Sequence, residues 1–349
     1  MKNNKLLFLL LAAVTLLCSC RAEWKFGKPF KKNNVKIVFL LPQSDPYGYS
    51  VAQSTGFATF MDLNGIKEDN VIIANNIDET NPEEIAAVTR LAIKNKANLV
   101  IGTSSGFAAV FEKLADEFTH VVFTCFGGDV FNNTNLTSYS SRDYQAQYMC
   151  GIVAAGQTGS NKIGFSLYKG NKLDAVYSDI NAFALGVERY NPNARIYVKQ
   201  VFSAADQDEY SRVSEYLQNK GCDVINQNNG IWAKTENTNL QLVSYIVYHW
   251  DLYYNKFFYS IIDGSFNTIP YYGGIAEGVI DVSPLGDVSK HKIQEEINSV
   301  RAAITDDNFN IFDGFLLTSD VPGNTNSTLT DDSVKQDVNW YYNNIILED

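Results

Sequence analysis

The chain has 349 residues, of which 45% are hydrophobic and 19% charged, and its formal net charge at pH 7 is −11. A nucleic-acid-binding protein is expected to present a basic face, so this acidic balance argues against that class. The length and the apolar content suffice for two domains, each with its own core.

Residues 1–19 are predicted to form a secretory signal peptide. Lys2 and Lys5 precede an apolar run at 6–17, which is shorter than the roughly 20 residues that span a bilayer. The run ends in LCSC (17–20), which resembles a bacterial lipobox. The resemblance implies cleavage before Cys20 and acylation of that cysteine, which would anchor the mature protein to the cell membrane on the extracytoplasmic side.

Residues 20–34 are interpreted as a lipidated linker that leads to the first domain. They are polar and basic and show no hydrophobic periodicity. The lysines of this segment are expected either to lie against anionic headgroups or to belong to a solvated spacer. They are Lys25, Lys28, Lys31 and Lys32.

Strand-like and helix-like segments alternate after the linker. The continuous apolar run at 35–41 is typical of a strand covered on both faces. Asn81-Pro82-Glu83-Glu84 predicts a helix start, with a capping residue, a first-turn proline and a capping-box acid. The other predicted elements are strands at 71–77, 97–103 and 120–126, helices at 48–63 and 107–117, and a polar loop at 127–135.

A second run of alternating units follows a small-residue-rich helix predicted at 142–156. It comprises strands at 162–168, 194–201 and 222–228 and helices at 172–190 and 206–219. Two such runs predict two doubly wound α/β lobes. The chain is expected to cross between the lobes near Ser140, His249 and Tyr272. The lobes would then comprise 35–140 with 249–272 and 141–248 with 273–349.

Ligands of such sheets bind at the carboxyl ends of the strands, and the residues there combine aromatic rings, amides and a few carboxylates. Rings stack on a flat heterocycle, and amides donate and accept hydrogen bonds along its edge. The predicted ligand-binding residues are Asp45, Tyr49, Ser105, Phe107, Asn181, Phe183, Asn228 and Trp250.

Each of these residue types has a particular expected role. Tyr49 and Phe107 are expected on one face of the ring, and Phe183 or Trp250 on the other. Core packing is the alternative for the aromatic residues, and for Phe183 it is the stronger one. Asn181 and Asn228 are expected at the heterocycle edge. Asp45 is expected to accept from a ring amino group or a sugar hydroxyl, or else to cap its own turn.

Eight stretches in order resemble the basic membrane protein family of bacterial substrate-binding lipoproteins, which serve ABC importers. The resemblance covers residues 35–316. The stretches are LVIGTSSGF (99–107), SRDYQAQYMCGIVAAG (141–156), KIGF (162–165), DINAFALGVERYNP (179–192), GCDVINQN (221–228), HWDLYY (249–254), DGSF (263–266) and GGIAEGVIDVSP (273–284).

The resemblance implies a type I periplasmic-binding-protein fold with a purine nucleoside or purine base bound between the lobes. It implies an ABC transporter permease as partner, a membrane contact through the lipid anchor, and no cofactor. A monomer is expected.

Two departures from the family pattern bear on the ligand. Asn228-Asn229-Gly230-Ile231 replaces a His-Thr-Asp-Ser run of the family branch that the chain most resembles. Residues 229–241 are also too few for the family's further strand–helix unit, which bears an acid near the ligand's sugar. We therefore expect the second sheet to lack one strand. A free base or another solute then becomes a stronger candidate, and loss of binding is an alternative.

Other protein classes have less support. Residues 102–106 (GTSSG) fit the pattern of a hydrolase nucleophile elbow, with Ser104 as nucleophile and His249 or His291 in a triad. A lipoprotein sensor or adhesin without transport would have the same ligand cleft. Neither a zinc site nor a disulfide framework is indicated, because Cys125, Cys150 and Cys222 show no paired spacing.

Overall fold

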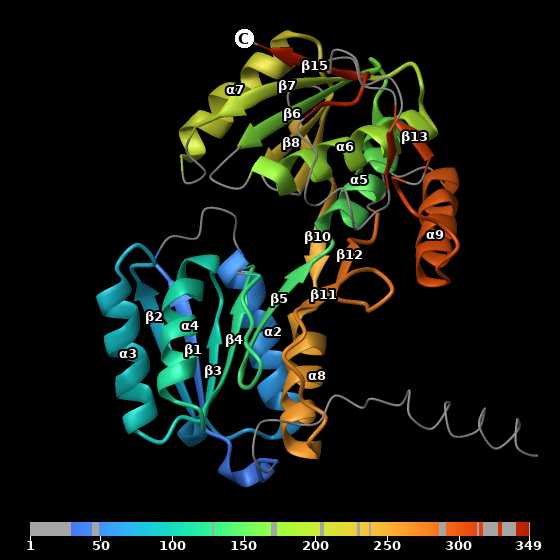
Figure 1. Cartoon of the computed structure of the whole chain (residues 1–349). Coiled ribbons are helices and arrows are strands. Elements are labelled where there is room, and N and C mark those ends of the chain that lie inside the picture. The colour runs from blue at the N-terminus through green and yellow to red at the C-terminus, as the bar shows by residue number, and fades with distance from the viewer. Residues whose placement is uncertain are drawn as a thin grey trace, which may run out of the picture.

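The computed structural model describes two α/β lobes, each built around its own sheet (Figure 1). The signal-peptide prediction and Cys20 fall outside the described residues. Within the part of the chain that the structure describes, no helix is both long and apolar enough to cross a membrane. The described residues are 29–43, 49–127, 129–168, 173–202, 206–228, 231–236, 239–285, 291–312, 314–316, 327–329 and 340–348.

The first lobe contains a sheet in which every described pairing is parallel, in the order β11-β5-β4-β3-β1-β2. Its strands are β1 (Ile37–Pro42), β2 (Val71–Ile77), β3 (Leu99–Gly102), β4 (Val122–Phe126), β5 (Leu136–Ser141) and β11 (Tyr271–Gly273). Its helices are α2 (Tyr49–Asn64), α3 (Pro82–Lys94), α4 (Ala108–Glu117) and α8 (Trp250–Asp263), with short 3-10 turns at η1 (Lys32–Asn34), η2 (Glu68–Asn70) and η3 (Ser105–Phe107).

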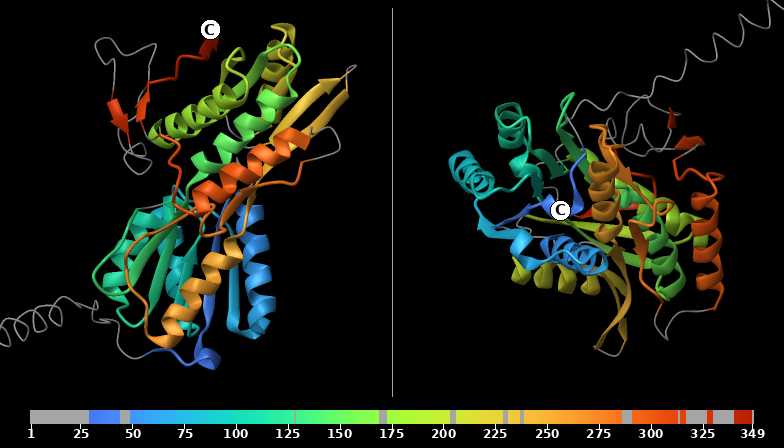
Figure 2. Two further views of the ribbon diagram at one scale, coloured as in Figure 1. Left: turned by 90° about the vertical axis from the view of Figure 1, so that its right-hand side faces the viewer. Right: turned by 90° about the horizontal axis from the view of Figure 1, so that it is seen from below.

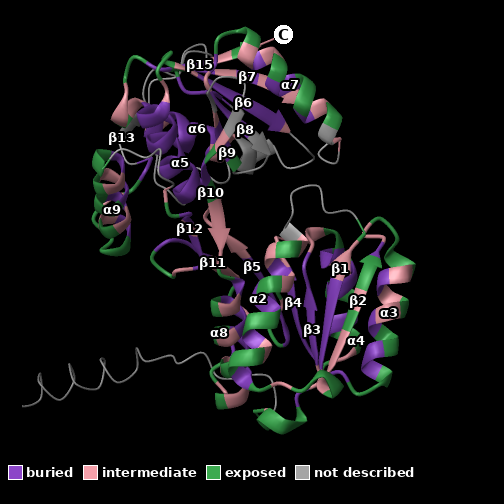
Figure 3. Cartoon of the chain, turned by 180° about the vertical axis from the view of Figure 1, so that it is seen from behind, coloured by how far each residue is buried: buried purple, intermediate pink, exposed green. Residues whose placement is uncertain are grey.

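Both faces of this sheet are covered, as the apolar run at 35–41 predicts. Ile37 and Phe39 pack with α2 and α8 on one face. Val38 and Leu40 pack with α3 and α4 on the other face. Burial on both faces explains why β1 reads as continuous rather than alternating hydrophobicity. Figure 3 shows these buried strands between more exposed helices.

The second lobe contains a mixed sheet in the order β12-β10-β9-β8-β6-β7-β15. Its strands are β6 (Lys162–Tyr168), β7 (Arg195–Val201), β8 (Val224–Asn228), β9 (Ile231–Glu236), β10 (Asn239–Tyr248), β12 (Ile280–Val282) and β15 (Ile345–Glu348). Its helices are α5 (Asp143–Gln157), α6 (Leu173–Tyr190), α7 (Gln207–Asn219) and α9 (His291–Thr305), and a separate pair is formed by β13 (Gly314–Leu316) and β14 (Ser327–Leu329).

The expectation that residues 229–241 leave the second sheet one strand short is wrong. These residues contain β9, which pairs antiparallel with both β8 and β10. A strand joined by a parallel crossover needs about a dozen connecting residues besides its own, which residues 229–241 do not provide. An antiparallel strand needs only a tight connection at each end, so a strand fits where a strand–helix unit does not.

Two glycines allow the close packing of the helices α5 and α6 in the second lobe. α5 and α6 pack with α9 over one face of the sheet, and α7 covers the other face. A Cβ atom at Gly151 of α5 would lie 2.1 Å from the Phe183 carbonyl oxygen. A Cβ atom at Gly186 of α6 would lie 2.0 Å from the Tyr148 carbonyl oxygen. The two helix backbones can approach this closely only because both positions lack a side chain.

The predicted start of the helix after Asn81 is confirmed. The Glu84 backbone N–H donates to the Asn81 side chain at 3.2 Å. Asp206 caps α7 in the same way, accepting from the Glu209 N–H at 2.9 Å. By contrast, β5 was not predicted, because its sequence LTSYSS lacks an apolar run.

The chain passes between the two sheets at three places, after β5, between β10 and α8, and after β11 (Figures 1 and 2). Arg142 joins two of these passages. Its backbone N–H donates to the Gly273 carbonyl at 2.7 Å, and its Nη1 donates to the Tyr272 carbonyl at 2.7 Å. Its guanidinium also lies over the Tyr272 ring, 4.5 Å from the centroid. Arg142 therefore links the passage after β5 to the passage after β11.

Candidate functional site

The candidate site begins at the carboxyl edge of the first sheet, which lies on the side of the first lobe that faces the second lobe (Figure 1). Ligands of doubly wound sheets bind at such edges. The residues that follow β2, β3 and β4 are therefore the groups that a ligand would meet in this lobe.

Ser104 and Glu79 form the polar centre of this edge. The Ser104 hydroxyl donates to a Glu79 carboxylate oxygen and accepts from the Gly106 N–H at 3.1 Å. Glu79 follows β2 in a turn fixed by the Asp78 carboxylate, which accepts from the Thr80 N–H at 2.9 Å. Both side chains of the Ser104–Glu79 pair are partly exposed. A hydrogen-bonded turn thus presents a carboxylate at the edge.

Gly106 makes room for this pair. A Cβ atom at Gly106 would lie 2.7 Å from the Glu79 Cβ and 3.1 Å from its Oε2 atom. The loop after β3 therefore approaches the loop after β2 more closely than any other residue would allow. Ser105, a predicted ligand residue, begins η3 in this loop and is partly exposed.

Three predicted stacking rings are fully buried in the lobe cores. Phe107 stacks on Phe111 within the core beneath α3 and α4. Phe183 stacks on Trp232 at a centroid distance of 4.2 Å and an interplanar angle of 7°. Their faces are occupied by protein, so in this conformation the structure gives them core roles instead of the predicted stacking roles.

Trp250 is also fully buried, but one of its polar atoms lacks a partner. Its ring stacks on Tyr248 at 5.8 Å and meets the edges of Phe126 and Tyr139 at 5.5 and 5.4 Å. Its indole Nε1 finds no hydrogen-bond acceptor within the described part of the chain. Such a buried donor is costly to leave unpaired. Trp250 is fully buried, so neither its ring face nor this N–H is accessible to a ligand in this conformation.

Asn181 serves a different purpose from the one predicted. It is fully buried, and its Nδ2 donates to the Trp340 carbonyl at 2.9 Å. Its Oδ1 accepts from the Tyr342 N–H at 2.8 Å. Asn181 thus pairs one carbonyl and one amide of the segment that leads into β15. The structure places its amide in the core of the second lobe, where it is engaged by backbone.

Three further predicted residues cannot be placed in the site. Asp45 lies outside the described residues. Tyr49 begins α2 and Asn228 ends β8, but their side chains are not among the described ones. Their ligand roles stay predictions.

The structure adds two aromatic residues that sequence reasoning missed. Phe202 follows β7 directly and is 76% exposed, an unusual degree of exposure for so large an apolar ring. Its N–H donates to both Glu209 carboxylate oxygens at 3.1 Å, which fixes the turn. Phe126 ends β4 and is half-buried. The available signal was position: Phe126 ends the strand predicted at 120–126, and Phe202 directly follows the strand predicted at 194–201.

A carboxylate pair lies near the passages between the sheets. Burial raises the pKa of Asp179 well above its ordinary value, and the nearby Asp143 carboxylate raises it further. Asp143 accepts from the Ser141 hydroxyl at 2.5 Å. Burial, with contributions from both carboxylates, also raises the pKa of Tyr272. The second lobe therefore has acidic groups beside the segments that join it to the first.

Known proteins resemble this chain in sequence over most of its length. A purine-binding protein of Brucella abortus is 24% identical over 274 residues, covering 73% of this chain and 76% of that protein. A Haloferax volcanii protein with the provisional name of ABC transporter glucose-binding protein is 23% identical over 252 residues. That match covers 67% of this chain and 63% of the length of the Haloferax protein.

Solved structures share the fold. An ABC transporter solute-binding protein from Conexibacter woesei superposes with a TM-score of 0.61 at 15% identity, covering 79% of this chain and 98% of that one. A solute-binding protein from Aeropyrum pernix gives a TM-score of 0.56 at 14% identity, covering 86% and 84%. The fold is that of type I periplasmic binding proteins, as the sequence predicts.

A family model described as ABC transporter substrate-binding protein PnrA-like matches residues 48–262, which is more than half of the chain. This match includes strands of both sheets and the first two passages between them. The chain belongs to the PnrA-like family of ABC transporter substrate-binding proteins.

Proposed function

We propose that this protein is a lipid-anchored, extracytoplasmic solute-binding protein that holds a purine base or purine nucleoside between its two lobes and delivers it to an ABC transporter permease. The family membership carries this proposal. The purine-binding relative from Brucella supports the choice of ligand. The signal-like leader and Cys20 support the anchor.

Accessible groups at the strand ends suit such a ligand. The exposed ring of Phe202 can stack on a heterocycle, and base stacking on an aromatic side chain contributes about 1–3 kcal/mol. Glu79 can accept a hydrogen bond from a ring amino group or a sugar hydroxyl, while Ser104 holds the carboxylate in place.

Truncation of Phe202 tests this arrangement. Phe202→Ala is expected to weaken adenosine binding roughly 5- to 150-fold, which corresponds to the loss of one stacking face. Tyr259→Ala is the matched control, because Tyr259 is an exposed ring (47%) near the far end of α8. Calorimetric titration of both variants measures the effect. Equal affinities for the two variants would contradict a role for Phe202 in binding.

We propose binding without chemical conversion of the ligand. Within the described part of the chain, the Ser104 hydroxyl bonds to Glu79 and Gly106 and to no histidine. A nucleophilic serine needs a base within hydrogen-bond reach, and histidine commonly fills that role. Incubation with a serine-reactive probe is expected to give no labelling. Labelling that disappears in Ser104→Ala would establish the hydrolase alternative.

A further inference from the structure

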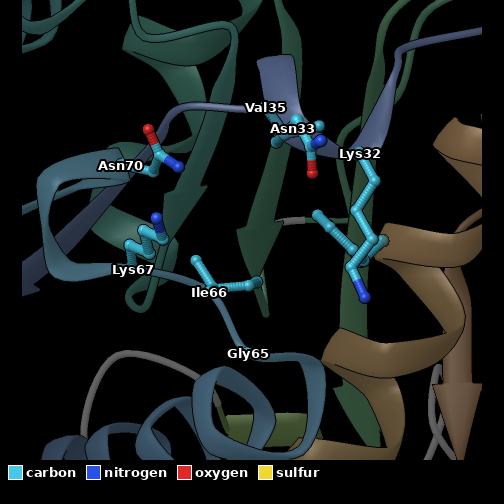
Figure 4. A pocket seen from close by; sticks show the side chains of 8 residues that line it. Lys32, Asn33, Val35, Gly65, Ile66, Lys67 and Asn70 are labelled. Atoms are coloured by element: carbon cyan, nitrogen blue, oxygen red, sulfur yellow. The ribbon is translucent and has the colours of Figure 1, made fainter.

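A cavity of about 320 Å³ lies at the opposite end of the first lobe from Ser104 and Glu79, at the amino-terminal edge of the sheet. Figure 4 shows it between η1, the turn that follows α2, and the start of η2. It is lined by Lys32, Asn33, Val35, Gly65, Ile66, Lys67, Asn70 and Phe258.

The polar lining of this cavity favours a negatively charged ligand. Its two charged residues, Lys32 and Lys67, are both cationic in a chain whose net charge is −11. Within the described residues, neither lysine forms an ion pair. The side-chain amides of Asn33 and Asn70 add hydrogen-bond donors.

The walls of the cavity are fixed by hydrogen bonds. The Val35 N–H donates to the Lys32 carbonyl at 3.3 Å, which closes η1. The Asn70 N–H donates to the Lys67 carbonyl at 2.9 Å, which closes η2. Gly65 turns the chain out of α2 with φ of 60°, a conformation that favours glycine. The two lysines therefore project from turns that are already formed before any ligand binds.

Acidic neighbours limit the strength of this site without closing it. Glu68 and Asp69 follow Lys67, but both are exposed and neither lines the cavity. Lys32 and Lys67 are exposed too, so solvent screens all four charges, and the lysines differ from the acids in that they line the cavity that a ligand would occupy.

We propose that this cavity binds a phosphate-type anion between the ammonium groups of Lys32 and Lys67, with Asn33 and Asn70 donating to the remaining oxygens. Lysine binds phosphate as a compact point charge with three donors. The anion could be a lipid headgroup phosphate or a free phosphate. If Cys20 carries the anchor, the 12 residues from Cys20 to Lys32 reach at most about 40 Å. The headgroups would then lie within range of the cavity.

Titration of the full chain, purified in detergent, tests the proposal with inorganic phosphate and glycerol phosphate as probes. Lys32→Gln and Lys67→Gln are each expected to weaken binding of the preferred probe by about 5- to 10-fold. Lys113→Gln, an exposed lysine of α4 away from the cavity, is the matched control and is expected to leave binding unchanged. Adenosine titration of the same variants shows whether the purine site is intact.

The outcomes separate the two sources of the anion. Tighter binding of glycerol phosphate, with lysine-dependent preference for phosphatidylglycerol over phosphatidylcholine vesicles, supports a lipid headgroup. Tighter binding of inorganic phosphate, with no such preference, supports a free anion. Absence of saturable binding of either probe overturns the proposal. Equal losses in the Lys113→Gln control overturn it as well, because the effect would then reflect general charge alone.

Discussion

Removal of the Asn181 side chain should destabilise the second lobe strongly while leaving purine binding intact. In Asn181→Ala, the Trp340 carbonyl loses a donor at 2.9 Å and the Tyr342 N–H loses an acceptor at 2.8 Å. Trp340 and Tyr342 are only 5% and 8% exposed, so water replaces these partners poorly. Leaving a buried polar group unpaired costs about 1–3 kcal/mol, so the two together should cost about 2–6 kcal/mol.

Urea unfolding followed by tryptophan fluorescence measures this loss. Asn219→Ala is the matched control, because Asn219 is exposed at the end of α7 and should change stability by less than about 0.5 kcal/mol. The sequence-based expectation of Asn181 at the heterocycle edge makes the opposite prediction. A variant with unchanged stability and lost purine binding would refute a structural role for Asn181.

Three further predictions concern helix packing, pH and the anchor. Gly151→Ala should cost about 3 kcal/mol in the same assay, because its Cβ would lie 2.1 Å from the Phe183 carbonyl oxygen. Gly159→Ala should not, because its Cβ would meet only the Asp223 Oδ2 atom at 3.5 Å, an ordinary van der Waals distance. Burial raises the pKa of Asp223, but hydrogen bonds from neighbours including Gly159 outweigh it and lower that pKa overall. At neutral pH the wild type should therefore have a larger free energy of unfolding than Asp223→Asn. This difference should disappear as the pH falls below 3.8 and through the lowered pKa of Asp223, and a difference that stays constant with pH would contradict the prediction. Cys20→Ala should move the protein from the detergent phase of a phase-separation assay to the aqueous phase, and continued membrane association after signal cleavage would exclude the lipid anchor.

Fold prediction succeeded where a segment's own chemistry decides its structure. The apolar run of β1 and the Asn81 cap depend on nearby residues and on burial that continuous hydrophobicity signals. Fold prediction failed where the neighbouring strands in a sheet determine whether a segment forms a strand. β9 exists because β8 and β10 flank it, and nothing in its own sequence IWAKTE excludes a loop. β5 likewise depends on its place between β4 and β11.

The site was harder to predict, because exposure is a property of the tertiary structure. Phe183 lies within a predicted helix and Phe202 directly follows a predicted strand, yet the first is fully buried against Trp232 and the second is 76% exposed. Glu79 became a candidate site residue only through its hydrogen bond with Ser104, which follows the next strand in the chain. Contacts between residues distant in sequence distinguish these cases, and a single sequence does not record them.

Calorimetric titration of the purified protein with adenine, adenosine, guanine, guanosine and glucose tests the central claim most directly. Saturable binding of a purine is expected, with the base binding about as tightly as its nucleoside, because residues 229–241 are too few for the strand–helix unit that the family resemblance places near the ligand's sugar. A nucleoside that binds far more tightly than its base would mean that another residue, such as Glu79, holds the sugar. Binding of glucose with no binding of any purine would contradict the purine assignment.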